Sequence, residues 1–304
     1  MRKYYEVRIL CVKEVTETLC SFLMENGALG AVEENVFVDR IKKGKVKEKV
    51  IGYFDSENDF FKIRGALKLF LNELKKNFQN FYSYRIITRK LKDKNWREGY
   101  KKYFKPIKVS RRIVVKPDYE KYFAKEHETV VLINPQMAFG IGNHPTTKMC
   151  IKYIDKILDG VENPAKLSVL DVGTGSGIIA ISAALLGAGD VYGFDIDEVS
   201  HEVACENVEK NGVMERVKLG CHGLEKVKKK YDIIAANILS NVLIDMRDKL
   251  LSVIKSGGDL ILSGILDTQK DEVIKAFLAD TPLKLVDTDK EKEWVVLHFK
   301  RAIN

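Results

Sequence analysis

Hydrophobic and polar positions follow two different rhythms along this chain. In the first ninety residues, apolar runs and helical spacings succeed one another in the order strand, helix, strand, strand, helix, strand. The clearest helical face lies in residues 57–78, where apolar side chains recur at Phe60, Ile63, Leu67, Phe70, Leu71, Leu74 and Phe78, after a capping Ser56. This order predicts a ferredoxin-like α+β unit. It carries no cluster of catalytic residue types, so we expect it to recognise a substrate.

From Leu167 onward, short apolar runs alternate with helical stretches. Five of these runs predict strands: KLSVLDV, DVYGFDI, RVKLG, YDIIAAN and DLILSGI. Strands separated by amphipathic helices need crossover connections, which predicts a mostly parallel sheet covered on both faces. We therefore expect a recognition domain at 1–90, a charged linker at 91–105, and a Rossmann-like α/β domain at 106–304. The candidate hinge lies near residues 90–98.

Composition narrows the class of protein without identifying it. With 45% hydrophobic and 31% charged residues, the chain is typical of a soluble globular protein. The start, MRKYYEVRILCV, lacks a signal-peptide core, and the longest apolar stretch, near 178–188, is too short to cross a bilayer. These features predict a cytoplasmic protein with no membrane contact. The five cysteines show no CxxC spacing, so we expect neither a disulfide framework nor a metal site.

The net charge of +8 is concentrated in one segment. Residues 85–116 contain thirteen Lys or Arg and only two acids, Asp93 and Glu98. Such a stretch can contact RNA through its phosphates. A stretch of this kind is more often simply a solvated basic surface, and both interpretations stay open.

Candidate chemistry begins with the sequence VLDVGTGSG at 169–177. Three glycines, Gly173, Gly175 and Gly177, follow an apolar run that ends at Asp171. This spacing predicts a tight strand-to-helix turn whose backbone approaches a ligand. The dinucleotide fingerprint GxGxxG needs its third glycine at position 178, which is Ile178. A glycine-rich turn with a helix-capping acid would need no ligand at all.

The next predicted strand strengthens the ligand interpretation. It ends in Asp195, twenty-two residues after Gly173, where a carboxylate can accept hydrogen bonds from two ribose hydroxyls. Together the two features resemble the class I S-adenosylmethionine-dependent methyltransferases, in which the glycine turn passes under the methionine and ribose of the cofactor.

The fourth predicted strand indicates the substrate. Asn237 stands at its carboxyl end, followed by Ile238, Leu239 and Ser240. Related adenine-amino and glutamine-amide methyltransferases carry Asn-Pro-Pro-Tyr there, with an aromatic ring that stacks on a flat substrate. The missing aromatic favours an aliphatic amine over a flipped base. A nucleic-acid methyltransferase and a non-catalytic ribosome-binding protein remain the alternatives.

The segment LINPQMAFGIGNHPTTKMC at 132–150 is similar to the pattern (D/N)P-x-x-AFG-x-G-x-HPTT of the PrmA family, whose members methylate large-subunit ribosomal protein L11. The resemblance covers the whole chain, with departures at Ile141 and Asn143. It implies S-adenosylmethionine as cofactor, ribosomal protein L11 as partner, a monomer, and methyl transfer to lysine side chains and an N-terminal amine.

The resemblance also assigns site residues. It makes Thr147, Gly173, Asp195 and Asn237 cofactor contacts, and Thr147 rests on the resemblance alone. Gly175 joins them from the turn itself, and we expect Asn237 to be catalytic as well. His144 has no orienting acid beside it, so we expect it to cap a helix or lock a loop rather than act as a general base.

Overall fold

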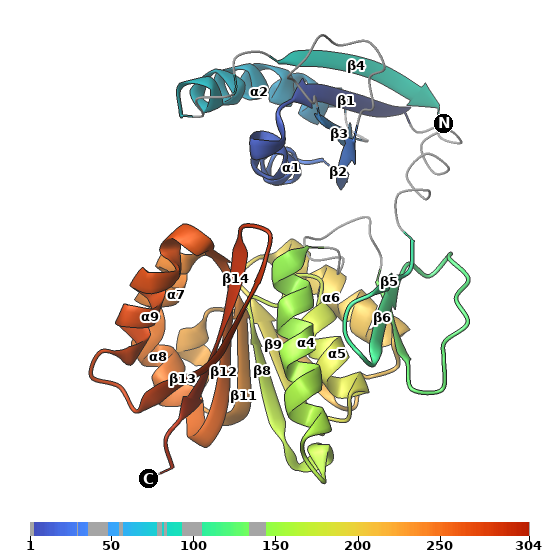
Figure 1. The fold of residues 1–304 in the computed structure, drawn as a ribbon. Coiled ribbons are helices and arrows are strands. Elements are labelled where there is room, and N and C mark those ends of the chain that lie inside the picture. The colour runs from blue at the N-terminus through green and yellow to red at the C-terminus, as the bar shows by residue number, and fades with distance from the viewer. Residues whose placement is uncertain are drawn as a thin grey trace. The chain divides into compact units, whose positions relative to one another are not determined.

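The structure is a computed structural model, and it describes residues 3–28, 30–35, 48–54, 57–77, 81, 84–92, 105–133 and 144–303. The chain divides into two compact units, Met1–Phe104 and Lys105–Asn304 (Figure 1). Most of the linker expected at 91–105, the capping Ser56, and the motif residues 134–143 lie outside the described residues.

The first unit has the ferredoxin-like arrangement that the sequence predicts. Its elements are β1 (Lys3–Cys11), the short helix η1 (Lys13–Val15), α1 (Thr16–Glu25), β2 (Gly30–Asn35), β3 (Glu48–Phe54), α2 (Glu57–Asn77) and β4 (Arg85–Lys92). The four strands pair antiparallel in the order β2-β3-β1-β4. Both helices belong to the βαββαβ repeat.

Helix α2 buries the face that its spacing predicts. Phe60, Ile63, Leu67, Leu71 and Leu74 are all buried, and they pack with alternate residues of β1 in a single apolar core. Because side chains alternate across a strand while they recur every three or four residues along a helix, one strand face and one helix stripe meet there.

The second unit is built on a seven-stranded sheet. Its strands are β8 (Ser168–Val172), β9 (Asp190–Asp195), β10 (Val217–Cys221), β11 (Tyr231–Asn237), β12 (Ile254–Leu266), β13 (Leu283–Glu291) and β14 (Trp294–Arg301). They lie in the order β10-β9-β8-β11-β12-β14-β13. The first five pair parallel and the last two antiparallel, so the predicted mostly parallel sheet is confirmed.

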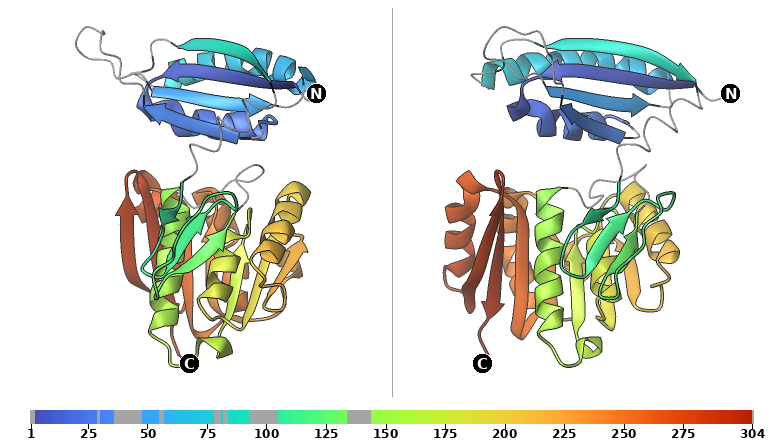
Figure 2. Two further views of the ribbon diagram at one scale, coloured as in Figure 1. Left: turned by 90° about the vertical axis from the view of Figure 1, so that its right-hand side faces the viewer. Right: turned by 45° about the vertical axis from the view of Figure 1, so that its right-hand side comes forward.

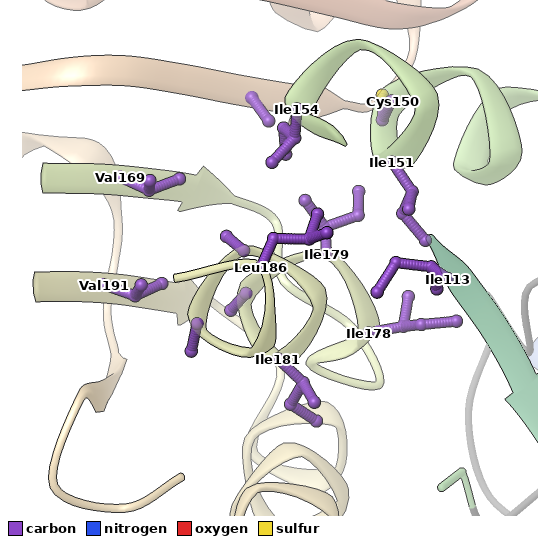
Figure 3. Close-up of a cluster of buried hydrophobic side chains, with 14 of the residues drawn as sticks. Ile113, Cys150, Ile151, Ile154, Val169, Ile178, Ile179, Ile181, Leu186 and Val191 are labelled. Atoms are coloured by element: carbon purple, nitrogen blue, oxygen red, sulfur yellow. The ribbon is translucent and has the colours of Figure 1, made fainter. Parts of the chain in front are cut away.

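Helices cover both faces of this sheet. They are α4 (Pro145–Asp159), α5 (Ile178–Leu185), α6 (Glu198–Lys210), α7 (Ser240–Asp245), α8 (Arg247–Val253) and α9 (Lys270–Leu278), with short helices η2 (Pro164–Lys166), η3 (Leu224–Lys226) and η4 (Asp267–Gln269). Val169 points into the core with α4 and α5 (Figure 3), and its neighbour Leu170 points into the core with α7, α8 and α9. Successive residues of one strand thus serve opposite layers.

Two parts of this unit were not predicted from the sequence. A three-stranded sheet of β5 (Ile107–Lys108), β6 (Ile113–Lys116) and β7 (Thr129–Leu132) packs beside α4 and α5 (Figure 2). The edge strand β13 was also missed. Strands of two to four residues are too short to show a period, and β13 is rich in charged residues, a composition that discourages pairing of an exposed edge with another chain.

The strand order determines where a ligand can bind. The chain runs from β8 outward to β9 and β10, then returns to β11 on the other side of β8. Ligands of open α/β sheets sit beyond the carboxyl ends of the strands at such a reversal. The reversal here lies between β8 and β11, the strands that lead into the glycine turn and end at Asn237.

Candidate active site

The turn after β8 has the backbone that its glycines predict. Gly173, Gly175 and Gly177 have φ angles of +69°, +54° and +79°. Residues with a side chain rarely adopt this left-handed region, so three positive angles within five residues explain the glycines at these positions. Gly177 is the N-cap of α5. The turn therefore lies at the carboxyl edge of the sheet, where the chain leaves β8.

Asp171 anchors the turn from inside the core. Its Oδ2 accepts hydrogen bonds from the Thr174 hydroxyl (2.6 Å) and the Ala180 amide (3.1 Å). Its Oδ1 is fully buried and has no partner among the described residues. Burial raises the pKa of this carboxyl to about 6, with Asp195 adding to the effect, although the two hydrogen bonds oppose it. A buried, unsatisfied carboxylate oxygen beside a ligand-binding turn fits a positively charged group.

Asp195 lies at the end of β9, directly beside the turn. Its Oδ2 accepts from the Gly175 amide at 2.9 Å, and its Oδ1 accepts from the Asp197 amide at 3.1 Å. Each carboxylate oxygen has further lone-pair capacity. The carboxylate is half-buried. It is therefore positioned to accept from two neighbouring hydroxyl groups while it holds the turn.

Helix α6 supports the turn from behind, a feature that the sequence did not reveal. The fully buried Asn207 donates from its side-chain amide to the Ser176 carbonyl at 2.9 Å. A β-carbon at Gly177 would lie 3.3 Å from the Cβ of Ala204, one turn earlier on α6. The turn is thus held by buried polar contacts on one side and by close packing on another.

Thr147 and Asn237 meet although ninety positions separate them. Thr147 is buried in the first turn of α4, and its hydroxyl oxygen accepts a hydrogen bond from the Asn237 amide at 3.2 Å. This contact leaves Oδ1 of Asn237 as an acceptor, and no described residue donates to it. Of the five predicted site residues, the structure thus joins Gly175 with Asp195, and Thr147 with Asn237.

His144 performs the capping role that the sequence predicts. It is the N-cap of α4, and its Nδ1 accepts from the Thr146 amide at 3.4 Å. Its ring also packs edge-on against Trp294, with centroids 5.2 Å apart. The cap orients the first turn of α4, which carries Thr147.

The surroundings of Asn237 are apolar and open. Leu239 is 64% exposed and Val242 is 37% exposed, and Ile238 is partly buried. Positions 238–240 offer no aromatic ring. This side of the site therefore suits an aliphatic chain rather than a stacked base.

At the end of β10, His222 forms a second feature missed in the sequence. Its ring stacks on Phe194 (centroids 5.5 Å apart) and its Nε2 lies 2.6 Å from the Tyr192 hydroxyl. Its Nδ1 lies 2.8 Å from the Gly223 carbonyl, which can only accept, so Nδ1 carries the proton and Nε2 accepts from Tyr192. The His222 backbone amide donates to the Asp195 carbonyl at 2.9 Å. A rigid ring therefore flanks Asp195.

Away from this edge of the sheet, the described chain has a cavity but neither a metal site nor a membrane-spanning helix. Within the described part of the chain, no three His, Cys, Asp or Glu side chains gather as a metal site, and no helix is long and apolar enough to cross a membrane. A cavity of about 470 Å³ lies between the β5–β6 turn, α4 and β13. Its lining includes none of the five predicted site residues, and two ion pairs cross it, Lys148 with Glu291 at 3.4 Å and Lys152 with Asp289 at 2.6 Å.

These groups fit S-adenosylmethionine. The positive-φ glycines give a backbone cradle, Asp195 offers two acceptor oxygens for a ribose diol, and the unsatisfied oxygen of Asp171 suits an ammonium group. With the strand order around β8, they define a class I S-adenosylmethionine-dependent methyltransferase. Residues 3–302 match the family model described as ribosomal protein L11 methyltransferase (PrmA), and the chain belongs to this family.

Individual relatives match this chain in sequence over nearly its whole length. The chain is 35% identical over 297 residues to a ribosomal protein L11 methyltransferase of Geobacter sp. (strain M21), which covers 95% of both chains. It is 34% identical over 317 residues to the one of Halalkalibacterium halodurans, with 99% of both covered. A crystal structure of ribosomal protein L11 methylase from Lactobacillus delbrueckii subsp. bulgaricus aligns with a TM-score of 0.59 and 33% identity, covering 65% of this chain and 98% of that one.

Proposed function

We propose that this protein transfers methyl groups from S-adenosylmethionine to lysine side-chain amines and the N-terminal amine of ribosomal protein L11. The observation that carries the proposal is Asn237, which Thr147 holds at the end of β11 beside the glycine turn, with apolar rather than aromatic neighbours. Membership of the PrmA family supports the identity of the protein substrate.

On the cofactor side, residues of the chain bind S-adenosylmethionine and orient it. Gly173 and Gly175 let the backbone approach the ligand, Asp195 accepts from the ribose hydroxyls, and Asp171 accepts from the ammonium group of the methionine part. The cofactor supplies an activated methyl group and a neutral leaving group. Because that chemistry is already favourable, the protein's main task is alignment.

On the amine side, the chain must accommodate a neutral nucleophile. A lysine amine with a pKa of about 10.4 loses its proton at pH 7 at a cost of about 4.6 kcal/mol, and a dry site lowers that cost. The exposed Leu239 and Val242 suit the aliphatic stem of the lysine. Oδ1 of Asn237 accepts an N–H bond of the amine, which directs the lone pair and stabilises the positive charge that develops on nitrogen.

The remaining parts of the proposal concern the rest of the chain. Residues 1–90 recognise the ribosomal protein, and a hinge near residues 90–98 presents different amines to one site. Basic residues within 85–116 make a weak contact with ribosomal RNA, and the protein acts as a monomer in the cytoplasm. The ferredoxin-like unit, in which we find no cluster of catalytic groups among its described residues, supports the recognition role.

The test is a transfer assay on purified components. The protein is incubated with ribosomal protein L11 and methyl-labelled cofactor, and modified residues are mapped by mass spectrometry. We expect label on lysines and the N-terminal amine, and none on ribosomal RNA supplied in a parallel reaction. Label on RNA alone would replace the proposal with an RNA methyltransferase, and no label on either would reject methyl transfer to both substrates.

A further inference from the structure

Ile238 occupies a slot between two glycines that both have positive φ. Gly173 in the cofactor turn has a φ of +69°, and Gly264 in β12 has a φ of +82°. Gly173 directly follows β8 and Gly264 lies in β12, and these two strands flank β11 in the sheet. The residue directly after Asn237 therefore lies between the cofactor turn and a neighbouring strand.

The side chain of Ile238 rests on the cofactor turn. A β-carbon built on Gly173 would lie 2.8 Å from Cγ2 of Ile238, and no other described atom outside its chain neighbours comes within 4 Å. Real Cβ contacts are essentially never that short. Cγ2 of Ile238 is thus the atom that covers Gly173.

The backbone of Ile238 rests on β12. A β-carbon on Gly264 would lie 2.3 Å from the Ile238 carbonyl oxygen and 3.0 Å from its nitrogen. The Ile238 amide also donates to the Ser263 carbonyl at 3.2 Å. The register of β12 with β14 shifts between Leu262 and Ile265, so the strand bulges where the Ile238 peptide passes.

We propose that Ile238 is a positioning residue that fixes Asn237 relative to the glycine turn. Gly264 makes this placement possible, because it leaves room for the Ile238 peptide. The proposal rests on the proposed function, because it gives Asn237 its place in methyl transfer. Three contacts then fix the position of Asn237. Its side chain hydrogen-bonds to Thr147, the Ile238 amide hydrogen-bonds to the Ser263 carbonyl, and Cγ2 of Ile238 packs against Gly173. When bound cofactor orders the glycine turn, the packing of Ile238 against Gly173 also orders the neighbouring Asn237.

The first test uses three variants of similar chemistry. Ile238→Ala removes Cγ2, whereas Ile238→Val keeps both γ-carbons. Ile274→Ala is the matched control, since Ile274 is partly buried against the same core on α9. We expect Ile238→Ala to lower kcat about tenfold or more while cofactor Kd changes less than about threefold. Ile238→Val and Ile274→Ala should stay within about twofold of the wild-type kcat.

An unchanged kcat in Ile238→Ala, or an equal loss in Ile274→Ala, would overturn the positioning role. Gly264→Ala extends the test within β12. Gly257 is its control, because it also has a positive φ (+72°), but a β-carbon there meets only Ile303, at 3.4 Å. Both alanines strain the backbone, and only Gly264→Ala should reduce kcat.

The second test needs no methyl transfer. Hydrogen exchange of a peptide spanning residues 233–243 is followed with and without S-adenosylhomocysteine, the unreactive product. We expect added protection in the wild type and in Ile238→Val, and its loss in Ile238→Ala. Equal protection in all three overturns the inference. If the wild type transfers no methyl group, the proposed function fails, and this exchange measurement decides the contact by itself.

Discussion

The two halves of the site, on either side of the switch between β8 and β11, are built differently. On the cofactor side, Asp171, Asp195 and Asn207 each make a hydrogen bond to the glycine turn or to its flanking residues, and two of these three side chains are fully buried. On the amine side, the Asn237 side chain makes one hydrogen bond within the described part of the chain, to Thr147, and its neighbour Leu239 is largely exposed.

This difference predicts that the cofactor side mainly controls binding affinity and that the amine side mainly controls the rate of methyl transfer. A turn that is hydrogen-bonded in advance binds a ligand without further ordering, so changes there should alter affinity. A lone side chain at an open apolar surface contributes mainly when the reacting atoms are aligned, so changes there should alter the rate. Of four substitutions, three test that division, and Asp171→Asn tests the buried carboxyl that anchors the turn.

The largest effect is expected from Gly175→Val. Its φ of +54° is unfavourable for any residue with a β-carbon and worst for a β-branched one, and its amide holds Asp195. Cofactor binding should fall below detection in calorimetry. Gly212→Val is the control, because Gly212 has a φ of +65° at the end of α6 with open space around it. If Gly212→Val also abolishes binding, backbone strain alone explains the loss.

Asn237→Ala should impair methyl transfer to the amine without a comparable loss of cofactor binding. We expect the single-turnover rate to fall by two to three orders of magnitude, on the order of 3–4 kcal/mol, with a much smaller change in cofactor affinity. Asn237→Asp should keep part of the rate, since a carboxylate can accept from both Thr147 and the amine. Asn241→Ala should behave as wild type, because Asn241 is an exposed asparagine in the first turn of α7. A normal rate in Asn237→Ala would leave that residue as a structural cap.

Asp171→Asn sharpens the contrast through pH. Burial raises the pKa of Asp171 to about 6, above its ordinary value of 3.8, so the folded protein keeps a proton that the unfolded chain releases between these values. The free energy of unfolding should therefore decrease as pH rises from about 4 to above 6, by up to about 3 kcal/mol from this group. In urea denaturation of the cofactor-free protein across this range, that decrease should appear as the difference between the wild type and Asp171→Asn, because carboxyls whose pKa is lowered, such as Asp155 and Asp232, contribute equally to both. Identical slopes would mean that Asp171 does not titrate there.

The smallest of the four effects is expected from Asp195→Ala. Loss of a half-buried carboxylate that accepts two hydroxyl groups should weaken cofactor binding by at least about tenfold. Asp195→Asn should fall between the alanine variant and wild type, because it keeps one acceptor oxygen. Unchanged affinity in Asp195→Ala, with the fold intact by circular dichroism, would place the ribose elsewhere.

Local sequence alone determined much of this protein. Periodicity placed β8 to β12 and the helix α2, because one buried face imposes a spacing of two or about three and a half residues. The glycines at 173, 175 and 177 indicated a left-handed turn, and the acid at 195 and the amide at 237 could be assigned to strand ends. His144 could be assigned a capping role from its position before Pro145.

Tertiary structure decided the rest, because contacts between distant segments leave no local pattern. Nothing near Thr147 in the sequence indicates that its hydroxyl meets Asn237, ninety positions away. The support from Asn207 depends on how α6 packs. The need for glycine at 264 comes from its φ of +82° and from the Ile238 carbonyl oxygen, which lies 2.3 Å from where a β-carbon would stand. The sequence specified which residues end the strands, and only the packing of the strands and helices determined which of those residues touch.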